Sequence, residues 1–164
     1  MRRLGLLVGL AAVILAGAGA AGAFAYGLPA SPVSLNGRLQ VAPAEITVSE
    51  DGNAFIVGPW KGSYRGWAGA PKHFPAIHWT DWSTSRAVGT GTEVVGNCKP
   101  NCTHGTFTAY ALRLWEWRPR VVHGRLIFTR LRWQFIGRRP PLIPPSVTAT
   151  AHYLGRGIWG WNPS

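Results

Sequence analysis

The sequence TFTAYALRLWEW at residues 106–117 and the sequence RLIFTRLRWQF at residues 125–135 are the two longest strand-like segments of the chain. Neither shows the sustained period of 3.6 residues that marks an amphipathic helix. The connection between them contains Pro119 and Gly124, which are turn-forming residues. The two segments therefore predict a long antiparallel hairpin.

The register of this hairpin decides which side chains share a face. Pairing Arg118 with Arg125 places Leu112 opposite Leu131 and makes one side mostly apolar. A shift of one residue would mix the two faces and put arginines into the core, so this pairing is favoured. The other side then carries the candidate binding residues, which are arginines and aromatic rings: Arg113, Trp115, Trp117, Phe128, Arg130 and Arg132.

Arginine side chains beside aromatic rings suit anionic or sugar ligands, because rings offer stacking area and guanidinium groups offer forked hydrogen bonds. The pairing also sets Arg113 directly opposite Arg130, and a bound counter-ion would relieve the repulsion between them. The alternative is that another loop or sheet covers Trp115, Trp117 and Phe128, while the arginines extend past its rim.

A second hairpin is predicted around the dipeptide Asp51-Gly52, which is typical of two-residue hairpin turns. In that register Val48 faces Phe55 and Ile46 faces Val57. All four apolar side chains would then lie on one side of the sheet.

Shorter strand-like segments occupy residues 77–82, 87–95 and 147–154. About seven strands separated by turn signals, with no helical segment, predict an all-β fold: a small antiparallel sandwich or barrel. The loop between residues 59 and 75 is a second candidate binding surface, because it places three aromatic rings among basic residues: Trp60, Tyr64 and Trp67.

The N-terminus has the pattern of an export signal. A basic start at Arg2 and Arg3 precedes the apolar run Leu4–Leu15, and Ala23 and Ala25 form an A-x-A motif. Cleavage is predicted after Ala25; the alternative is an uncleaved membrane anchor, since the segment is long enough to cross a bilayer. The chain is therefore divided into a signal peptide (1–25), an extended linker (26–43), an all-β domain (44–154) and a tail (155–164).

Composition excludes several classes of protein. With 46% hydrophobic residues and nine Trp, the chain is too rich in core-forming residues to be disordered, and with 14% charged residues it is not a charge-laced helical rod. Residues 26–164 carry 15 of the 17 basic residues and all six acids, a formal charge of +9. Such a charge implies anionic surroundings, such as wall polymers, phosphate-bearing surfaces or nucleic acid.

Cys98 and Cys102 are the two cysteines, and Pro100 lies between them. In an exported protein, an even pair this close is typical of a disulfide. Closing so small a loop contributes only about 2 kcal/mol, so the bridge would mainly fix a turn. The alternative is a metal site that uses both cysteines with His104 and His123, but paired cysteines in structural zinc sites usually enclose two residues rather than three.

No catalytic constellation is visible in the sequence. Glycoside hydrolysis requires two acids that face each other, and of the six acids Asp81 and Glu93, from neighbouring predicted strands, are the one pair worth testing. The motifs G-x-S-x-G and H-E-x-x-H, a phosphate-binding loop and a dinucleotide fingerprint are all missing. These absences favour a protein without enzymatic activity, and no catalytic residue, metal or cofactor is assigned.

Three motifs occur in order, WTDWS at 79–83, AVGTGT at 87–92 and CKPNCTHG at 98–105, and are followed by GRLIFTRL at 124–131. The set resembles small exported proteins of actinomycete-type bacteria that carry no assigned function. The resemblance covers about residues 77–141. It implies secretion and a bridged cysteine pair, and it implies no activity.

Together these features predict a secreted, basic β-domain that binds an anionic or glycan polymer at the cell envelope through the Arg/aromatic side of the 106–135 hairpin. Contact with the membrane is expected only through the N-terminal segment, if that segment stays uncleaved. Nucleic-acid binding would fit the charge but not the export. The alternatives are an envelope-associated hydrolase whose carboxylates converge in three dimensions, and a structural or partner-binding domain.

Overall fold

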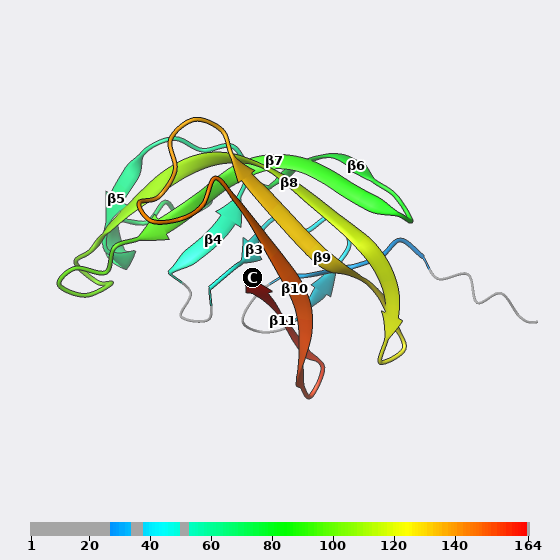
Figure 1. Ribbon diagram of the computed structural model, residues 1–164. Coiled ribbons are helices and arrows are strands. Elements are labelled where there is room, and N and C mark those ends of the chain that lie inside the picture. Colours follow the sequence, from blue (N-terminus) through cyan, green and yellow to red (C-terminus); the bar gives the residue numbers. More distant parts are fainter. Residues whose placement is uncertain (1–26, 34–37, 50–52, 164) are drawn as a thin grey trace, which may run out of the picture.

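The computed structural model describes residues 27–33, 38–49 and 53–163. Within those ranges the chain forms a strongly curved, nearly closed antiparallel barrel (Figure 1). The described part has no α-helix, and its one helical element is a single 3₁₀ turn at Trp67–Gly69. The predicted all-β antiparallel fold is therefore confirmed, in its barrel form. The predicted signal peptide, residues 1–25, lies outside the described residues.

The main sheet has the strand order β11-β10-β9-β8-β7-β4-β3, with β5 paired to β8 and β6 paired to β7, and β1 and β2 form a separate small ribbon. The strands are β1 (Ser31–Pro32), β2 (Leu39–Gln40), β3 (Ile46–Thr47), β4 (Ala54–Val57), β5 (Ser63–Arg65), β6 (His78–Trp82), β7 (Arg86–Gly96), β8 (Thr106–Val122), β9 (Arg125–Phe135), β10 (Ser146–Gly155) and β11 (Ile158–Pro163).

The long strand β7 curves because it changes partners halfway along one edge. It pairs with β6 over residues 87–90 and then with β4 over residues 92–95, while β8 occupies its other edge throughout. Gly91 lies at the change of partner, where a Cβ atom would stand 2.4 Å from the carbonyl oxygen of Val57. Only glycine permits this close approach of two backbones, so Gly91 allows the sheet to bend into a barrel.

The long β8–β9 hairpin exists as predicted, but its predicted register is wrong by four residues. Val122 pairs with Arg125, so β8 continues past Trp117 and the turn is the dipeptide His123-Gly124. Arg118 therefore does not pair with Arg125. Because four is an even number, the shift leaves Trp115, Trp117, Arg130 and Arg132 on their predicted face, and alternation alone could not reveal it.

The β3–β4 hairpin also exists, and its register differs by one residue from the prediction. Ile46 pairs with Ile56 and Thr47 with Phe55, while the turn at residues 50–52 lies outside the described residues. Phe55 consequently faces away from Ile46, and the predicted single apolar side is wrong. The sequence of β4, AFIV, is buried on both faces, so its apolar pattern could not select one of them.

Two apolar clusters result. The larger one fills the barrel and is made of Ile46, Val48, Ile56, Ile77, Leu112, Leu114, Leu131, Trp133, Phe135, Val147, Ala149 and Trp161. The smaller one lies on the opposite face of β4 and β7, where the ring of Tyr64 stacks on Phe107 with centroids 4.8 Å apart. The 59–75 loop thus uses Tyr64 and the half-buried Trp60 to cover this cluster, although Trp67 remains 46% exposed.

The N-terminal segment predicted as a linker is part of the barrel. The Val33 carbonyl accepts a hydrogen bond from the Thr47 amide of β3 (3.0 Å), and the Pro32 carbonyl accepts one from Trp161 Nε1 of β11 (3.0 Å). Ser31, Pro32 and Val33 are all buried. This segment therefore bridges the two edge strands of the sheet. The predicted tail likewise contains β11, which pairs with β10.

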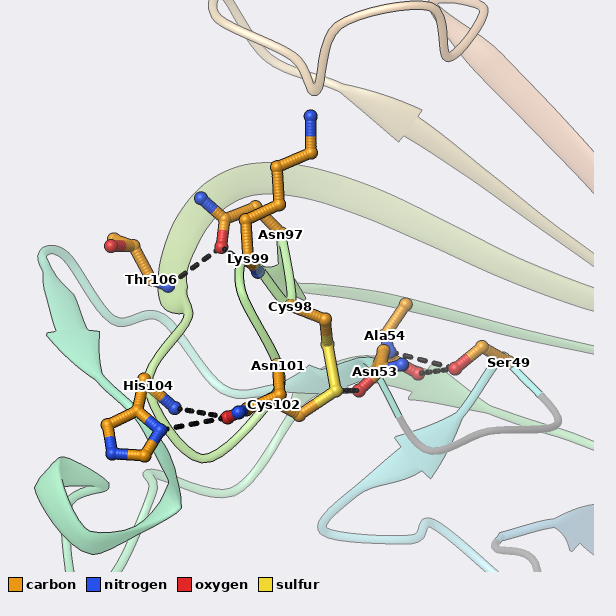
Figure 2. Close-up of a disulfide and its surroundings, with 10 residues drawn as sticks. All are labelled: Ser49, Asn53, Ala54, Asn97, Cys98, Lys99, Asn101, Cys102, His104 and Thr106. Atoms are coloured by element: carbon orange, nitrogen blue, oxygen red, sulfur yellow. Dashed lines mark hydrogen bonds between the residues drawn. A yellow bond between two sulfur atoms is a disulfide. The ribbon is translucent and has the colours of Figure 1, made fainter.

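The cysteines form the predicted disulfide, Cys98–Cys102, in the loop that joins β7 to β8 (Figure 2). The loop is organised by two asparagines. Asn97 Oδ1 accepts hydrogen bonds from the amides of Lys99 and Thr106, and Asn101 Oδ1 accepts one from the amide of His104. The disulfide and these side-chain hydrogen bonds fix the conformation of the loop between β7 and β8.

We expect Gly91→Ala to destabilise the fold by about 1–3 kcal/mol, because the added Cβ would push β4 away from β7. Urea unfolding of the purified domain measures this loss. The matched control is Gly27→Ala, since a Cβ at Gly27 meets no atom within 4 Å. Equal stability of the two variants would contradict the role given to Gly91.

Candidate functional site

Four of the predicted binding residues form two cross-strand pairs on the outer face of the barrel. Trp115 of β8 pairs with Arg132 of β9, and Trp117 pairs with Arg130. The observed register thus sets each tryptophan beside an arginine. The predicted Arg113–Arg130 pair is replaced, because Arg113 pairs with Gln134.

Neighbouring strands hold the arginines of this face in place. An amino group of Arg130 donates a hydrogen bond to Thr150 Oγ1, and Arg132 Nε donates one to Ser146 Oγ at 2.7 Å, both hydroxyls belonging to β10. These neutral acceptors orient the guanidinium groups and leave their charge uncompensated. The outer face therefore combines fixed cations with aromatic rings.

Phe128 does not belong to this surface, although the prediction included it. Its side chain is 0% exposed, and its ring packs edge-on against Trp82 with centroids 5.6 Å apart. Trp82 is in turn held by the N-terminal segment, because its Nε1 donates a hydrogen bond to the Pro29 carbonyl (3.0 Å). Arg113 and Arg132 are exposed, and the three remaining predicted residues are half-buried: Trp115, Trp117 and Arg130.

A shallow groove of about 350 Å³ opens on the same face, between the two tryptophans and the residues beside them. Its lining includes Trp115, Trp117, Arg132, Arg86 and Gln134. Arg86 and Gln134 were not among the binding residues predicted from the sequence. Gln134 could be found only with the correct register, and Arg86 only by knowing that it pairs with Trp117 across β7 and β8.

Among the described residues, one acidic side chain forms an ion pair at this face. Of the described residues, Arg86 forms the one ion pair, with Asp81 at 2.9 Å between Nε and Oδ2, and both partners are exposed enough for solvent to weaken it. Glu116, which also lines the groove, is 0% exposed. Its Oε1 accepts a hydrogen bond from Ser31 Oγ at 2.8 Å, while its Oε2 has no partner.

Burial controls the ionisation of the two interior carboxyl groups. Desolvation raises the pKa of Glu116 to about 8, against the hydrogen bond from Ser31, which lowers it. Desolvation raises the pKa of Glu93 to about 7, against the bond that Trp133 Nε1 donates at 3.1 Å. Glu116 is consequently mostly neutral at pH 7, so the molecule is more positive than its formal charge.

The carboxyl pair considered for hydrolysis, Asp81 and Glu93, is not brought together. Asp81 pairs with Val88, so Glu93 lies five residues further along β7, roughly 16 Å away at the rise of a strand. Retaining or inverting glycosidases need carboxyl groups closer than about 10 Å. This pair therefore supports no glycoside hydrolysis.

Comparisons with protein families, with curated proteins and with solved structures found no match to this chain. In the described ranges, no three His, Cys, Asp or Glu side chains are grouped so that they could hold a metal ion. The same residues include no helix with the length and hydrophobicity needed to span a bilayer.

The buried Glu116 should make the protein less stable as the pH rises. Its pKa is raised from 4.5 in the unfolded chain to about 8 in the fold, so between these values folding retains a proton and stability falls by about 1.4 kcal/mol per pH unit. Below about pH 7 the buried Glu93 adds a slope of the same sign. Glu116→Gln should therefore reduce the slope by roughly half below pH 7 and flatten it above pH 7, when urea unfolding is measured from about pH 5.5 to 7.5.

Two further variants test the assignment. Glu93→Gln should flatten only the part of the profile below about pH 7. Ser31→Ala removes the hydrogen bond that lowers the pKa of Glu116 and should move the upper limit of the slope to higher pH. Identical pH profiles for the wild type and Glu116→Gln would contradict the buried, neutral state of this carboxyl group.

Proposed function

We propose that the protein binds an anionic polymer or acidic glycan of the cell envelope through the outer face of β7 to β10. The observation that carries the proposal is the pairing of Trp115 with Arg132 and of Trp117 with Arg130 across β8 and β9. Each pair combines an aromatic platform for a sugar ring or aliphatic chain with a fork of donors for an anionic group.

The two pairs form a repeated unit. Residues two apart along a strand are separated by about 7 Å, so Trp115 and Trp117 offer equivalent platforms at that spacing, and Arg130 and Arg132 offer equivalent cations. A repeating array suits a polymer with repeating units, because successive units can make the same contacts. The groove is shallow, as a site for a chain passing across the surface would be.

The electrostatics of the face support an anionic partner. The two arginines of the pairs are anchored to hydroxyl groups rather than to carboxylates. The nearest acidic side chain in the interior, Glu116, is largely protonated at neutral pH because it is buried. A polyanion would therefore meet little competing negative charge and would be attracted over a distance of about one Debye length.

An extracellular location is part of the proposal. The Cys98–Cys102 disulfide is of a kind that persists in oxidising compartments. The basic and apolar pattern of residues 1–25 predicts export. Envelope polymers that carry phosphate or carboxylate groups are the abundant polyanions in such a location.

Affinity electrophoresis in gels containing polygalacturonate or long-chain polyphosphate tests the binding. Arg132→Gln should weaken retention about three- to tenfold, as expected for the loss of one charge-assisted contact. The matched control is Arg138→Gln, which removes the same charge from an exposed loop position outside the groove. Retention should also decrease as salt is raised from about 50 mM to 500 mM.

A third variant separates stacking from charge. Trp115→Leu should weaken retention on polygalacturonate and leave its dependence on salt unchanged, because no charge is removed. Equal losses for Arg132→Gln and Arg138→Gln would show that binding follows net charge alone. Retention that does not respond to salt would exclude the electrostatic contribution.

A further inference from the structure

The tips of the β8–β9 hairpin and the β10–β11 hairpin point to the same end of the barrel (Figure 1). A second cavity is lined by residues of both tips. Its volume is about 510 Å³, within the usual range for small-molecule sites. Six side chains that line it come from three parts of the chain: Arg38, His123, Arg125, Tyr153, Arg156 and Trp159. None of them contributes to the groove on the outer face.

Each of the two hairpin tips has a large side chain at a turn position with positive φ. Each turn consists of two residues with positive φ, His123-Gly124 (48° and 72°) and Arg156-Gly157 (53° and 80°). Two-residue turns of this type favour Asn or Gly at the first position, because a larger side chain is strained there. Here that position carries an imidazole in one turn and a guanidinium in the other, and both side chains line the cavity.

Aromatic rings form the wall between the two tips. The ring of His123 lies 4.1 Å from that of Tyr153, and Tyr153 lies 5.0 Å from Trp159, measured between centroids. Tyr153 Oη accepts a hydrogen bond of 2.9 Å from the amide of Gly157, which ties the ring to the second turn. The contact between rings thus holds the two hairpins together and leaves Tyr153 38% exposed at the cavity.

Positive charge is concentrated in this cavity without a counter-charge. Arg38, which precedes β2, Arg125 of β9 and Arg156 of the β10–β11 turn are exposed side chains, and none of the described residues that line the cavity carries a carboxylate. In the described part of the chain, none of the three forms an ion pair. Cations that converge without acids repel one another, so a bound anion would stabilise the arrangement.

We propose that this cavity binds a phosphate monoester of a small ring compound. The ring of the ligand packs against the exposed ring of Tyr153, and the phosphate group is held by the arginines. The cavity is lined by three guanidinium groups and one imidazole, which together offer more hydrogen-bond donors than the two oxygens of a carboxylate can accept. The three terminal oxygens of a phosphate group match this number of donors better. The site is independent of the polymer groove and does not rest on the function proposed for it.

Quenching of tryptophan fluorescence, checked by calorimetry, can measure binding with four probes: phenyl phosphate, glucose 1-phosphate, inorganic phosphate and phenol. We expect phenyl phosphate or glucose 1-phosphate to bind at least tenfold more tightly than inorganic phosphate, and phenol not to bind. Tighter binding of the aryl ester would identify a planar ring as the ligand body, and tighter binding of the other ester would identify a sugar.

Arg125→Gln and Arg156→Gln should each weaken binding of the better ester at least fivefold. The matched control is Arg120→Gln, an exposed arginine of the same hairpin that does not line the cavity. Thermal unfolding monitors the fold of every variant, and Arg156→Asn, which suits the turn better, separates loss of the charge from damage to the hairpin. The proposal is overturned if neither ester binds, or if Arg120→Gln weakens binding as much as Arg125→Gln.

Discussion

The strict alternation of β8 is the constraint on which the rest of the structure depends. Leu112 and Leu114 point into the barrel and are fully buried, while Trp115 and Trp117 point outward beside arginines of β9. A shift of one residue in the pairing would exchange the faces and bury Arg130, and an unpaired buried charge costs several kcal/mol. The strand that builds the core therefore also fixes the composition of the outer surface.

This constraint explains how much of the fold the sequence could predict. The apolar alternation and the turn signals predicted an all-β antiparallel fold, and the hairpin from 106 to 135 was placed with its faces correctly separated except at Phe128. Apolar alternation could not predict the register of that hairpin, because a shift of four residues keeps alternate side chains on the same faces. The register is fixed by the two-residue turn His123-Gly124. A histidine with positive φ is unusual in such a turn, so the sequence did not point to it.

Contacts between distant segments account for what could not be predicted. The segment at residues 29–33 has no alternation and contains two prolines, yet it closes the gap between β3 and β11 through backbone carbonyls. Such a role depends on a partner surface that exists only after the barrel has formed. The same segment holds Trp82, whose ring packs against the buried Phe128, so Phe128 is not part of the candidate site. The hairpin-tip cavity was missed for a similar reason, since its residues come from hairpins that are far apart in the sequence.

The N-terminal segment also links the stability of the barrel to the chemistry of the outer face. Ser31 donates to Glu116, the residue between the two tryptophans of the groove, and the Pro32 carbonyl accepts from Trp161 in the core. If residues 29–33 left the barrel, Glu116 would lose its donor and gain water, and its pKa would fall toward that of an exposed carboxyl group. An ionised glutamate would then lie directly behind Trp115 and Trp117, where it would oppose an anionic ligand.

The packing of five residues near the N-terminus therefore keeps a negative charge away from the arginine surface. This is a physical reason for the domain to begin well before the first strand that the sequence pattern reveals. It also accounts for the presence of a buried acid that lowers the stability of the fold at neutral pH. In its neutral form Glu116 fills the space behind the groove without weakening the positive potential on which the proposed recognition of a polyanion depends.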